Sequence, residues 1–442
     1  MPKLALTSTE KKAFKLHFFY SIIEGYILGV LALNEFVFIK SLKGSNVQVG
    51  LLFQFSVMVL IFSIFFNEAI KRIKNKKKLV IITGLVTRLP LLLLLLFPSQ
   101  HSIMPVNAFY HYIFLAIFLL FYFSNPVIYP IINLFLKKNF THQNFGRLYS
   151  YSTTANKITM LAVTFVYGIL LDYSEQSYRY AFASVAVLGV ISCYLLASIN
   201  YEEKGELLPY TNLLDSVKKT ISGMRNIMKQ NKAFADFEAG FMFYGFAFMG
   251  TVSVITIFYE RALHLNYSSV AYYKNVYNIL AILILPYFGK LIGRIDPRKF
   301  AAISFGSFLL YILFTALTQF WPGYFTLAGV KLYYSLNIAA FFNGIFAATM
   351  ALLWSIGSSY FCRNEDVGDY QSIHLTFTGV RSFFAPLLGV LFYELFGFAV
   401  TFIIGIGFLL IAVYTVIRSQ KKEKLPVPLH EIPDMVEINP KG

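Results

Sequence analysis

Long uninterrupted runs of apolar residues recur along the chain. Four clear examples cover residues 79–97, 180–199, 300–317 and 399–417. Only the first of these contains a charged side chain, Arg88. A helix needs about 20 apolar residues to cross roughly 30 Å of hydrocarbon, and these runs have about that length. A soluble core needs no apolar runs this long, so the pattern predicts an all-α membrane protein.

The apolar runs and the polar segments between them predict twelve transmembrane helices in two pseudo-symmetric bundles of six. The expected helices cover 14–39, 48–66, 79–97, 104–136, 145–171, 178–199, 233–259, 267–288, 299–319, 331–360, 368–393 and 398–417. The expected organisation is an N-terminal bundle (1–199), a cytoplasmic linker (200–232), a C-terminal bundle (233–418) and a disordered cytoplasmic tail (419–442).

Two further patterns support this organisation. Within the linker, apolar residues at helical spacing, with basic residues on the other face, predict an amphipathic helix on the inner membrane surface. Its apolar positions are Leu213, Leu214, Val217, Ile221, Met224 and Met228. The halves also share residues at a nearly constant offset, which suggests duplication of a six-helix unit. Gly25 and Asn46 correspond to Gly245 and Asn266, and Arg72, Gly146 and Thr154 correspond to Arg294, Gly368 and Thr376.

The charge distribution predicts the orientation in the membrane. The chain is 57% hydrophobic and 14% charged, with 38 Lys and Arg residues and a formal net charge of +16. With both termini in the cytoplasm, the inside segments hold 29 of these cations and the outside loops hold five. Cytoplasmic loops are the ones enriched in Lys and Arg. The net charge is therefore interpreted as an orientation signal near anionic lipid, and no nucleic-acid partner is expected.

Motifs for other chemistries are missing from the sequence. Cys193 and Cys362 lie in or beside apolar runs, which argues against a disulfide framework or a thiol metal site. There is no Walker loop, His/Cys metal cluster or hydrolase nucleophile elbow. We therefore expect no enzyme activity, no cofactor and no metal.

Two segments carry a family resemblance. The loop from Gly289 to Lys299 reads GKLIGRIDPRK, and the equivalent loop in the first half, 67–78, keeps only the basic end. The helix-11 segment 370–389 contains the runs YQSIH, TGVR and APLLG. Both are similar to the major facilitator superfamily. The resemblance implies a twelve-helix transporter whose cytoplasmic loops take part in gating, with candidate residues Arg72, Gly289, Arg294, Asp296 and Arg298.

Three ionic side chains are expected deep in the membrane. Counted from the nearest cytoplasmic charge, Glu24, Lys157 and Arg381 lie about 13, 15 and 18 Å along their helices. A charge at this depth is costly unless it meets water or a partner, so such residues are candidates for solute binding or proton coupling. Each cation also ends a polar stripe at helical spacing. The stripes are Ser150, Thr153, Thr154 and Lys157 in one helix, and Gln371, His374, Thr378 and Arg381 in the other.

The two stripes suggest opposed walls of one aqueous cavity, but each residue also has a structural alternative. Glu24 is expected either to exchange a proton or to lock helices by pairing with Lys157 or Arg381. His374 is a proton relay or a packing residue, and Arg88 is expected to have a structural partner. Candidates for solute binding or for bonding between helices are Asn133 and Asn337. Glu238 is only six residues from Lys232 and is explained by the inner interface.

These observations predict a secondary active transporter that moves a small solute by alternating access, by symport or antiport. Two cations against one carboxylate favour a solute with a negative group, and Glu24 suggests proton coupling. Export of drugs or amphipathic metabolites is the first alternative, and a non-transporting membrane sensor or assembly protein is the second. We expect a monomer in the cell's inner membrane, with the lipid bilayer, the solute and protons as its partners.

Overall fold

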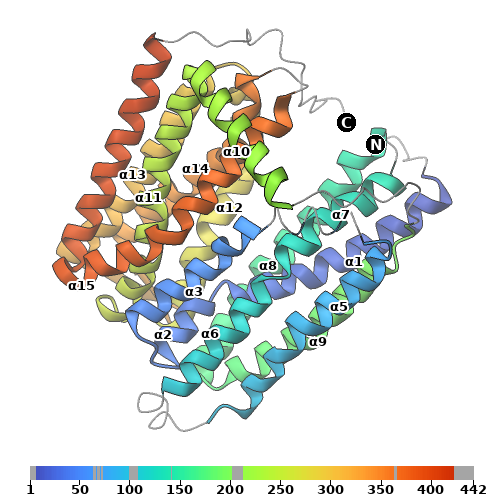
Figure 1. The fold of residues 1–442 in the computed structure, drawn as a ribbon. Coiled ribbons are helices and arrows are strands. Elements are labelled where there is room, and N and C mark those ends of the chain that lie inside the picture. The colour runs from blue at the N-terminus through green and yellow to red at the C-terminus, as the bar shows by residue number, and fades with distance from the viewer. Residues whose placement is uncertain are drawn as a thin grey trace. The chain divides into compact units, whose positions relative to one another are not determined.

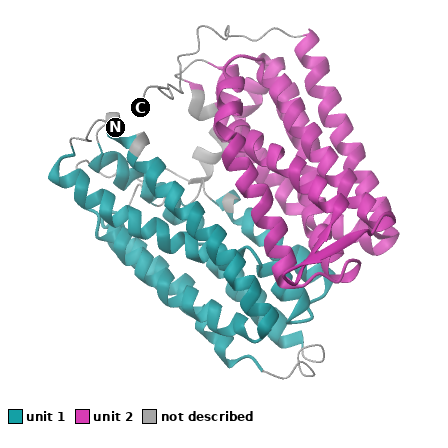
Figure 2. Cartoon of the chain, turned by 180° about the vertical axis from the view of Figure 1, so that it is seen from behind, with its two compact units in different colours: residues 1–211, 442 teal, residues 212–441 magenta. Residues whose placement is uncertain are grey.

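The computed structural model describes residues 6–62, 66, 70, 73–98, 108–140, 142–201, 213–362 and 366–422 of the 442-residue chain. The described residues are almost entirely helical, with one two-stranded sheet. The chain divides into two compact units, residues 1–211 and residues 212–441 (Figure 2). Each unit is described by itself.

Unit 1 consists of successive helices that lie side by side (Figure 1). Two begin with a capping box, in which a Ser or Thr and the Glu or Gln three residues on satisfy each other's backbone N–H groups. The elements are α1 (Ser8–Leu31), α2 (Asn34–Lys40), α3 (Asn46–Met58), η1 (Val59–Phe62), α5 (Lys76–Arg88), η2 (Leu89–Leu96), α6 (Ala108–Tyr122), α7 (Asn125–Asn139), α8 (His142–Tyr173) and α9 (Ser177–Ala197).

Unit 2 begins with the helix predicted in the linker and ends with the longest helical segment of the chain. That segment joins two helices at Gly397, whose φ of 76° lies in the left-handed region that favours glycine. The elements are α10 (Leu213–Gln230), α11 (Lys232–Arg261), α12 (Tyr267–Ile292), α13 (Pro297–Phe320), β1 (Tyr324–Leu327), β2 (Val330–Tyr333), α14 (Tyr334–Ile356), η3 (Gly357–Phe361) and α15 (Val367–Lys422).

The predicted twelve-helix architecture is confirmed. Among the described residues, ten helical segments are long and apolar enough to cross a membrane. One of them, Tyr370–Lys422, contains both of the last two expected spans on either side of Gly397. The remaining expected span, 48–66, corresponds to α3 and η1, of which α3 is a shorter apolar helix. The first, third and fourth spans are each built from two consecutive helical pieces.

The start of the tenth helix was placed wrongly, because a β-hairpin precedes it. Helix α14 begins at Tyr334, whereas the sequence predicted a helix from 331. Strands β1 and β2 pair antiparallel from Tyr324 opposite Tyr333 to Leu327 opposite Val330. The turn residues Ala328 and Gly329 both have positive φ, as a two-residue hairpin turn requires. The apolar residues of β2 are buried. In the sequence they continue without a break into the apolar residues of α14, so the strand was read as part of the helix.

The same helix crossing occurs inside each unit. In unit 1, a Cβ atom added to Gly25 of α1 would lie 2.4 Å from the backbone oxygen of Asn156 and 3.0 Å from the Cβ of Thr159, both in α8. In unit 2, a Cβ atom on Gly245 of α11 would lie 2.1–2.4 Å from the side chain of Arg381 in α15. Gly245 lies 220 residues after Gly25, and Arg381 lies 222 residues after Thr159. The two glycines therefore let equivalent helices approach closely, and this agrees with the predicted duplication.

Candidate functional site

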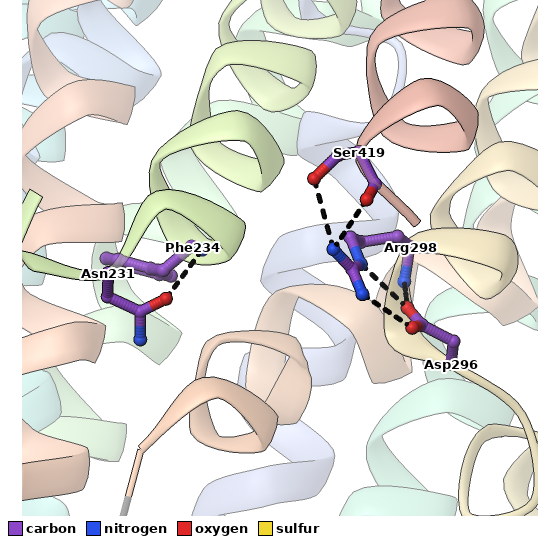
Figure 3. A network of polar contacts seen from close by, with 5 residues as sticks. All are labelled: Asn231, Phe234, Asp296, Arg298 and Ser419. Atoms are coloured by element: carbon purple, nitrogen blue, oxygen red, sulfur yellow. Dashed lines mark hydrogen bonds and ion pairs between the residues drawn. The ribbon is translucent and has the colours of Figure 1, made fainter. Parts of the chain in front are cut away.

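A buried ion pair joins the loop after α12 to the last helix of unit 2 (Figure 3). Asp296 caps α13, and its carboxylate accepts from the backbone N–H of Arg298 at 2.8 Å. The Arg298 guanidinium donates to the same carboxylate at 2.8 and 3.0 Å, and to the backbone oxygen and Oγ of Ser419 at 3.1 Å. Arg298 is only 1% exposed. Of the predicted gating residues, Asp296 and Arg298 are therefore brought together.

The other predicted gating residues are not part of this network. Gly289 lies in α12, and Arg294 is exposed, with no hydrogen bond or ion pair from its side chain to any described residue. Arg72 lies outside the described residues. The gating role of the loop stays a prediction.

Glu24 lies half-buried on α1 and faces α9. Its Oε1 accepts a hydrogen bond from the Ser192 hydroxyl at 2.7 Å. Within the described part of unit 1, no lysine or arginine nitrogen comes within 4.0 Å of this carboxylate, so Glu24 and Lys157 are not an ion pair. The alternative in which Glu24 is locked by Lys157 is thus not supported in this conformation.

Arg88, expected to have a structural partner, lies at the end of α5 near Glu24. Its guanidinium stacks over the Phe121 ring at 3.8 Å and is 3% exposed, yet its Nε and Nη1 have no hydrogen-bond partner. A Cβ atom added to Gly189 of α9 would lie 3.0 Å from the Arg88 side chain, and Glu24 accepts from Ser192 of the same helix. Unit 1 therefore contains a carboxylate and a guanidinium that face the same helix without forming an ion pair.

The predicted polar stripe of α8 lies on an exposed face. Ser150, Thr153, Thr154 and Lys157 are all exposed, and Lys157 forms no hydrogen bond or ion pair with a described residue. The packed side of α8 instead carries Asn156, whose Nδ2 donates to the backbone oxygen of Ser21 in α1 at 2.9 Å. Asn133 of α7 is likewise exposed and forms no hydrogen bond with a described residue.

Arg381 is buried in the interior of unit 2, where α15 crosses α11. It is 1% exposed, and its Nη1 donates to the backbone oxygen of Phe241 at 2.5 Å. The guanidinium also lies 5.8 Å from the centre of the Tyr244 ring, and its Nε has no partner. In this conformation Arg381 is therefore held by α11 and is not accessible to a solute.

Next to Arg381, the structure reveals a buried pair that the sequence interpretation missed. His374 Nδ1 lies 2.9 Å from Glu238 Oε1, and both side chains are 1% exposed. Glu238 Oε2 and His374 Nε2 are buried without a hydrogen-bond partner. His374 also contacts the rings of Phe241 and Trp354 edge-on. Glu238, which had been attributed to the inner interface, is thus the partner of a predicted site residue.

The remaining predicted site residues form bonds within unit 2. Asn337 of α14 accepts from the Tyr272 hydroxyl of α12 at 3.1 Å and donates to the Tyr333 backbone oxygen at 2.9 Å. Thr378 is buried and donates to the His374 backbone oxygen at 3.0 Å. Asn337 therefore bonds between helices in the way that the structural alternative expected.

Comparison with known proteins identifies the family. A family model described as Major Facilitator Superfamily matches residues 16–336, well over half of the chain. The chain belongs to the major facilitator superfamily. The resemblance inferred from the loop and helix motifs is confirmed, and this superfamily member is a multi-pass integral membrane protein. Comparison with curated protein sequences finds no match.

Solved structures of transporters share the fold of this superfamily member. A crystal structure of the nucleoside transporter NupG matches with a TM-score of 0.65 and 13% identity, over 95% of this chain and 100% of that chain. The peptide transporter POT in complex with sulfate matches with 0.64 and 11%, over 93% and 95%. The xylose transporter XylE from E. coli matches with 0.57 and 10%, over 92% and 95%. Identities this low establish the fold alone.

Proposed function

We propose that this protein is a secondary active transporter that moves a small solute with a negative group by alternating access and couples this movement to protons. Lys157 is the cation that meets the solute, and Glu24 is the proton carrier. Both termini lie in the cytoplasm, as the Lys and Arg distribution predicts, and the protein acts as a monomer in the inner membrane. Reporter fusions to each terminus test the cytoplasmic orientation, and the mass of the detergent-solubilised protein tests whether it is a monomer.

The observation that carries this proposal is that deep charges are left without ionic partners inside their own unit. Lys157 is exposed and unbonded among the described residues, and Arg88 and Arg381 have buried N–H groups without acceptors. A buried charge with no partner is costly, and a protein that used these residues only to hold helices together would saturate them. The unsatisfied groups favour a transporter over the sensor or assembly alternative.

Transport assays with a solute panel test the role of Lys157. The similar structures include nucleoside, peptide and xylose transporters, so the panel contains uridine, dialanine and xylose, each with a carboxylated or phosphorylated analogue. We expect the purified protein in liposomes to move anionic members. Lys157→Ala should raise the KM for them at least tenfold, and Lys157→Arg should retain transport. Lys137→Ala, at an exposed lysine of α7 in the same unit, is the matched control. If the neutral forms are transported in preference to the anionic ones, the proposal of an anionic solute is refuted.

Proton coupling at Glu24 is tested separately. A pH-sensitive dye inside the liposomes should report proton movement that depends on the solute. Glu24→Gln should abolish that signal while leaving solute counterflow measurable, because exchange of solute needs no net proton transfer. Ser192→Ala removes only the hydrogen bond to the Glu24 carboxylate and should keep coupling. If the rate of solute uptake by the unsubstituted protein does not depend on the pH gradient, this part of the proposal is refuted.

An apolar cavity favours export of amphipathic compounds as the second candidate. A cavity of about 420 Å³ lies in unit 2 between α11 and α15. Its walls are apolar side chains and glycines, together with two threonines, and include Phe243, Phe246 and Phe408. A site of this kind suits an acyl chain or a drug. Expression in a host that lacks its own efflux pumps should then raise resistance to lipophilic compounds, and no change in resistance would remove this candidate.

A further inference from the structure

Unit 2 contains a second cavity whose character differs from the apolar one. It has a volume of about 290 Å³ and is lined by residues of four helices, α11, α12, α13 and α14. Seven of its fifteen lining residues are aromatic, and polar groups lie among them. The aromatic residues are Phe248, Tyr259, Tyr273, Tyr277, Phe308, Tyr311 and Phe346.

The aromatic walls are packed against one another in fixed positions. The Phe308 ring lies 4.6 Å from the Phe346 ring and 5.3 Å from the Phe248 ring. The Tyr273 hydroxyl donates to the backbone oxygen of Lys331 at 3.2 Å and accepts from the Tyr333 N–H at 2.7 Å. Rings held in this way present flat faces and edges to whatever enters the cavity, at little further cost in side-chain entropy.

An amide and a cation are among the polar side chains that line the cavity. Asn343 of α14 is half-buried, and its amide forms no hydrogen bond with any described residue. The ammonium of Lys274 on α12 is the only charged group among the lining residues. A cation beside aromatic walls recognises an anionic group, and the amide of Asn343 can donate to or accept from the same ligand.

We propose that this cavity binds a small aromatic acid, that is, a planar ring of one or two cycles that carries a carboxylate. Its ring packs among Phe248, Phe308 and Phe346, and its carboxylate lies toward Lys274 and Asn343. The volume lies near the lower end of small-molecule sites, roughly 300–1,000 Å³, and suits a ligand of this size. The inference goes beyond the proposed function, because it assigns an anion-binding site to unit 2 in addition to Lys157 of unit 1, and it rests on that function only where it concerns transport.

Equilibrium binding to the full chain in detergent tests the inference without requiring transport. The probes are radiolabelled benzoate and indole-3-carboxylate, with unlabelled competitors that each lack one feature. Benzamide lacks the charge, cyclohexanecarboxylate lacks the flat ring, and octanoate stands for a fatty acid. We expect both aromatic acids to bind and each competitor to be at least tenfold weaker. Equal competition by octanoate or cyclohexanecarboxylate, or no binding of either aromatic acid, would overturn the proposal.

Variants localise the binding. Asn343→Asp keeps the size of the side chain but adds a negative charge, and should weaken benzoate binding at least tenfold. Lys274→Met should reduce the preference for benzoate over benzamide. Lys290→Met and Tyr287→Phe change exposed positions of α12 outside the cavity and should leave binding unchanged. A binding curve untouched by both cavity variants, with melting temperatures unaltered, would also overturn the proposal.

The two proposals fail in different ways. If benzoate binds as described but no organic anion is moved across liposomes, the cavity inference stands and the transport proposal falls. If anions are transported but Asn343→Asp has no effect on binding or transport, the transport proposal stands and the aromatic cavity is not the solute site.

Discussion

The crossing of α11 and α15 at Gly389 allows a sharp prediction about packing. A Cβ atom added to Gly389 would lie 1.9 Å from the backbone oxygen of Gly250 and 2.5 Å from its Cα. The reverse substitution is different, because a Cβ atom on Gly250 would lie 3.4 Å from the Ala385 oxygen and 3.6 Å from the Gly389 Cα. We therefore expect Gly389→Ala to destabilise unit 2 and Gly250→Ala to be tolerated.

The magnitude follows from this geometry. A carbon and an oxygen in contact need at least about 3 Å, so the two helices must separate by roughly 1 Å, and a gap of that size forfeits up to about half of each pairwise attraction. Overpacking costs typically about 1–3 kcal/mol, and rigid backbone on the other side puts this case at the upper end. The higher helix propensity of alanine offsets up to about 1 kcal/mol. The net loss is about 2 kcal/mol, or roughly 4–8 °C in Tm for a domain of this size.

The two cysteines supply the assay. Cys193 and Cys362 are free thiols buried in the described structure, so a thiol-reactive fluorophore labels them only as the protein unfolds. Gly407 lies in α15 as well, and a Cβ atom there would meet nothing within 4 Å. Gly407→Ala is therefore the matched control and should melt at or slightly above the unsubstituted protein. The packing argument is refuted if Gly389→Ala melts within 1 °C of this control.

Three other changes have defined outcomes. Arg298→Met leaves the largely buried carboxylate of Asp296 without its cation and should lower stability by about 3–5 kcal/mol, read from the same melting curves. His374→Phe leaves the Glu238 carboxylate buried and unpaired, so the double variant with Glu238→Met should be more stable than His374→Phe alone, and a lower melting temperature would contradict this. Burial raises the pKa of the Cys362 thiol from 9.0 to about 11 in the folded protein, so stability should fall as the pH rises from 9 to 11. In a Cys362→Ser variant, the stability measured by urea unfolding should lose the part of this pH dependence that comes from the thiol.

The spans could be predicted because hydrophobic length is a local property. A run such as 79–97 must cross the hydrocarbon wherever its neighbours lie, so its position in the sequence is enough. The hairpin β1–β2 was missed for the same reason. Its second strand is apolar and continues directly into α14, so the helical run hid the strand, and only the Ala328–Gly329 turn marked the boundary.

The polar stripes show what helical spacing can and cannot predict. Spacing correctly placed Thr154 and Lys157 on one face of α8, and His374 and Arg381 on one face of α15. It could not predict which neighbour covers each face. The first stripe is exposed, whereas the second is packed against α11.

The missed Glu238–His374 pair has a related cause. The two residues are 136 positions apart, and nothing local to either one identifies the other. The depth estimate treated Glu238 as reachable from the interface because Lys232 is near in sequence. A clue was available in Gly245, since a glycine at the crossing of α11 and α15 brings their polar side chains together.

The hairpin between α13 and α14 also has a practical consequence. Strand β1 is exposed along its whole length, and the turn residues Ala328 and Gly329 are exposed as well. Loop tips of this kind tolerate insertions well. A short epitope placed between Ala328 and Gly329 should therefore leave folding intact and give antibodies a handle on intact cells, which would reveal directly which side of the bilayer this end of the molecule faces.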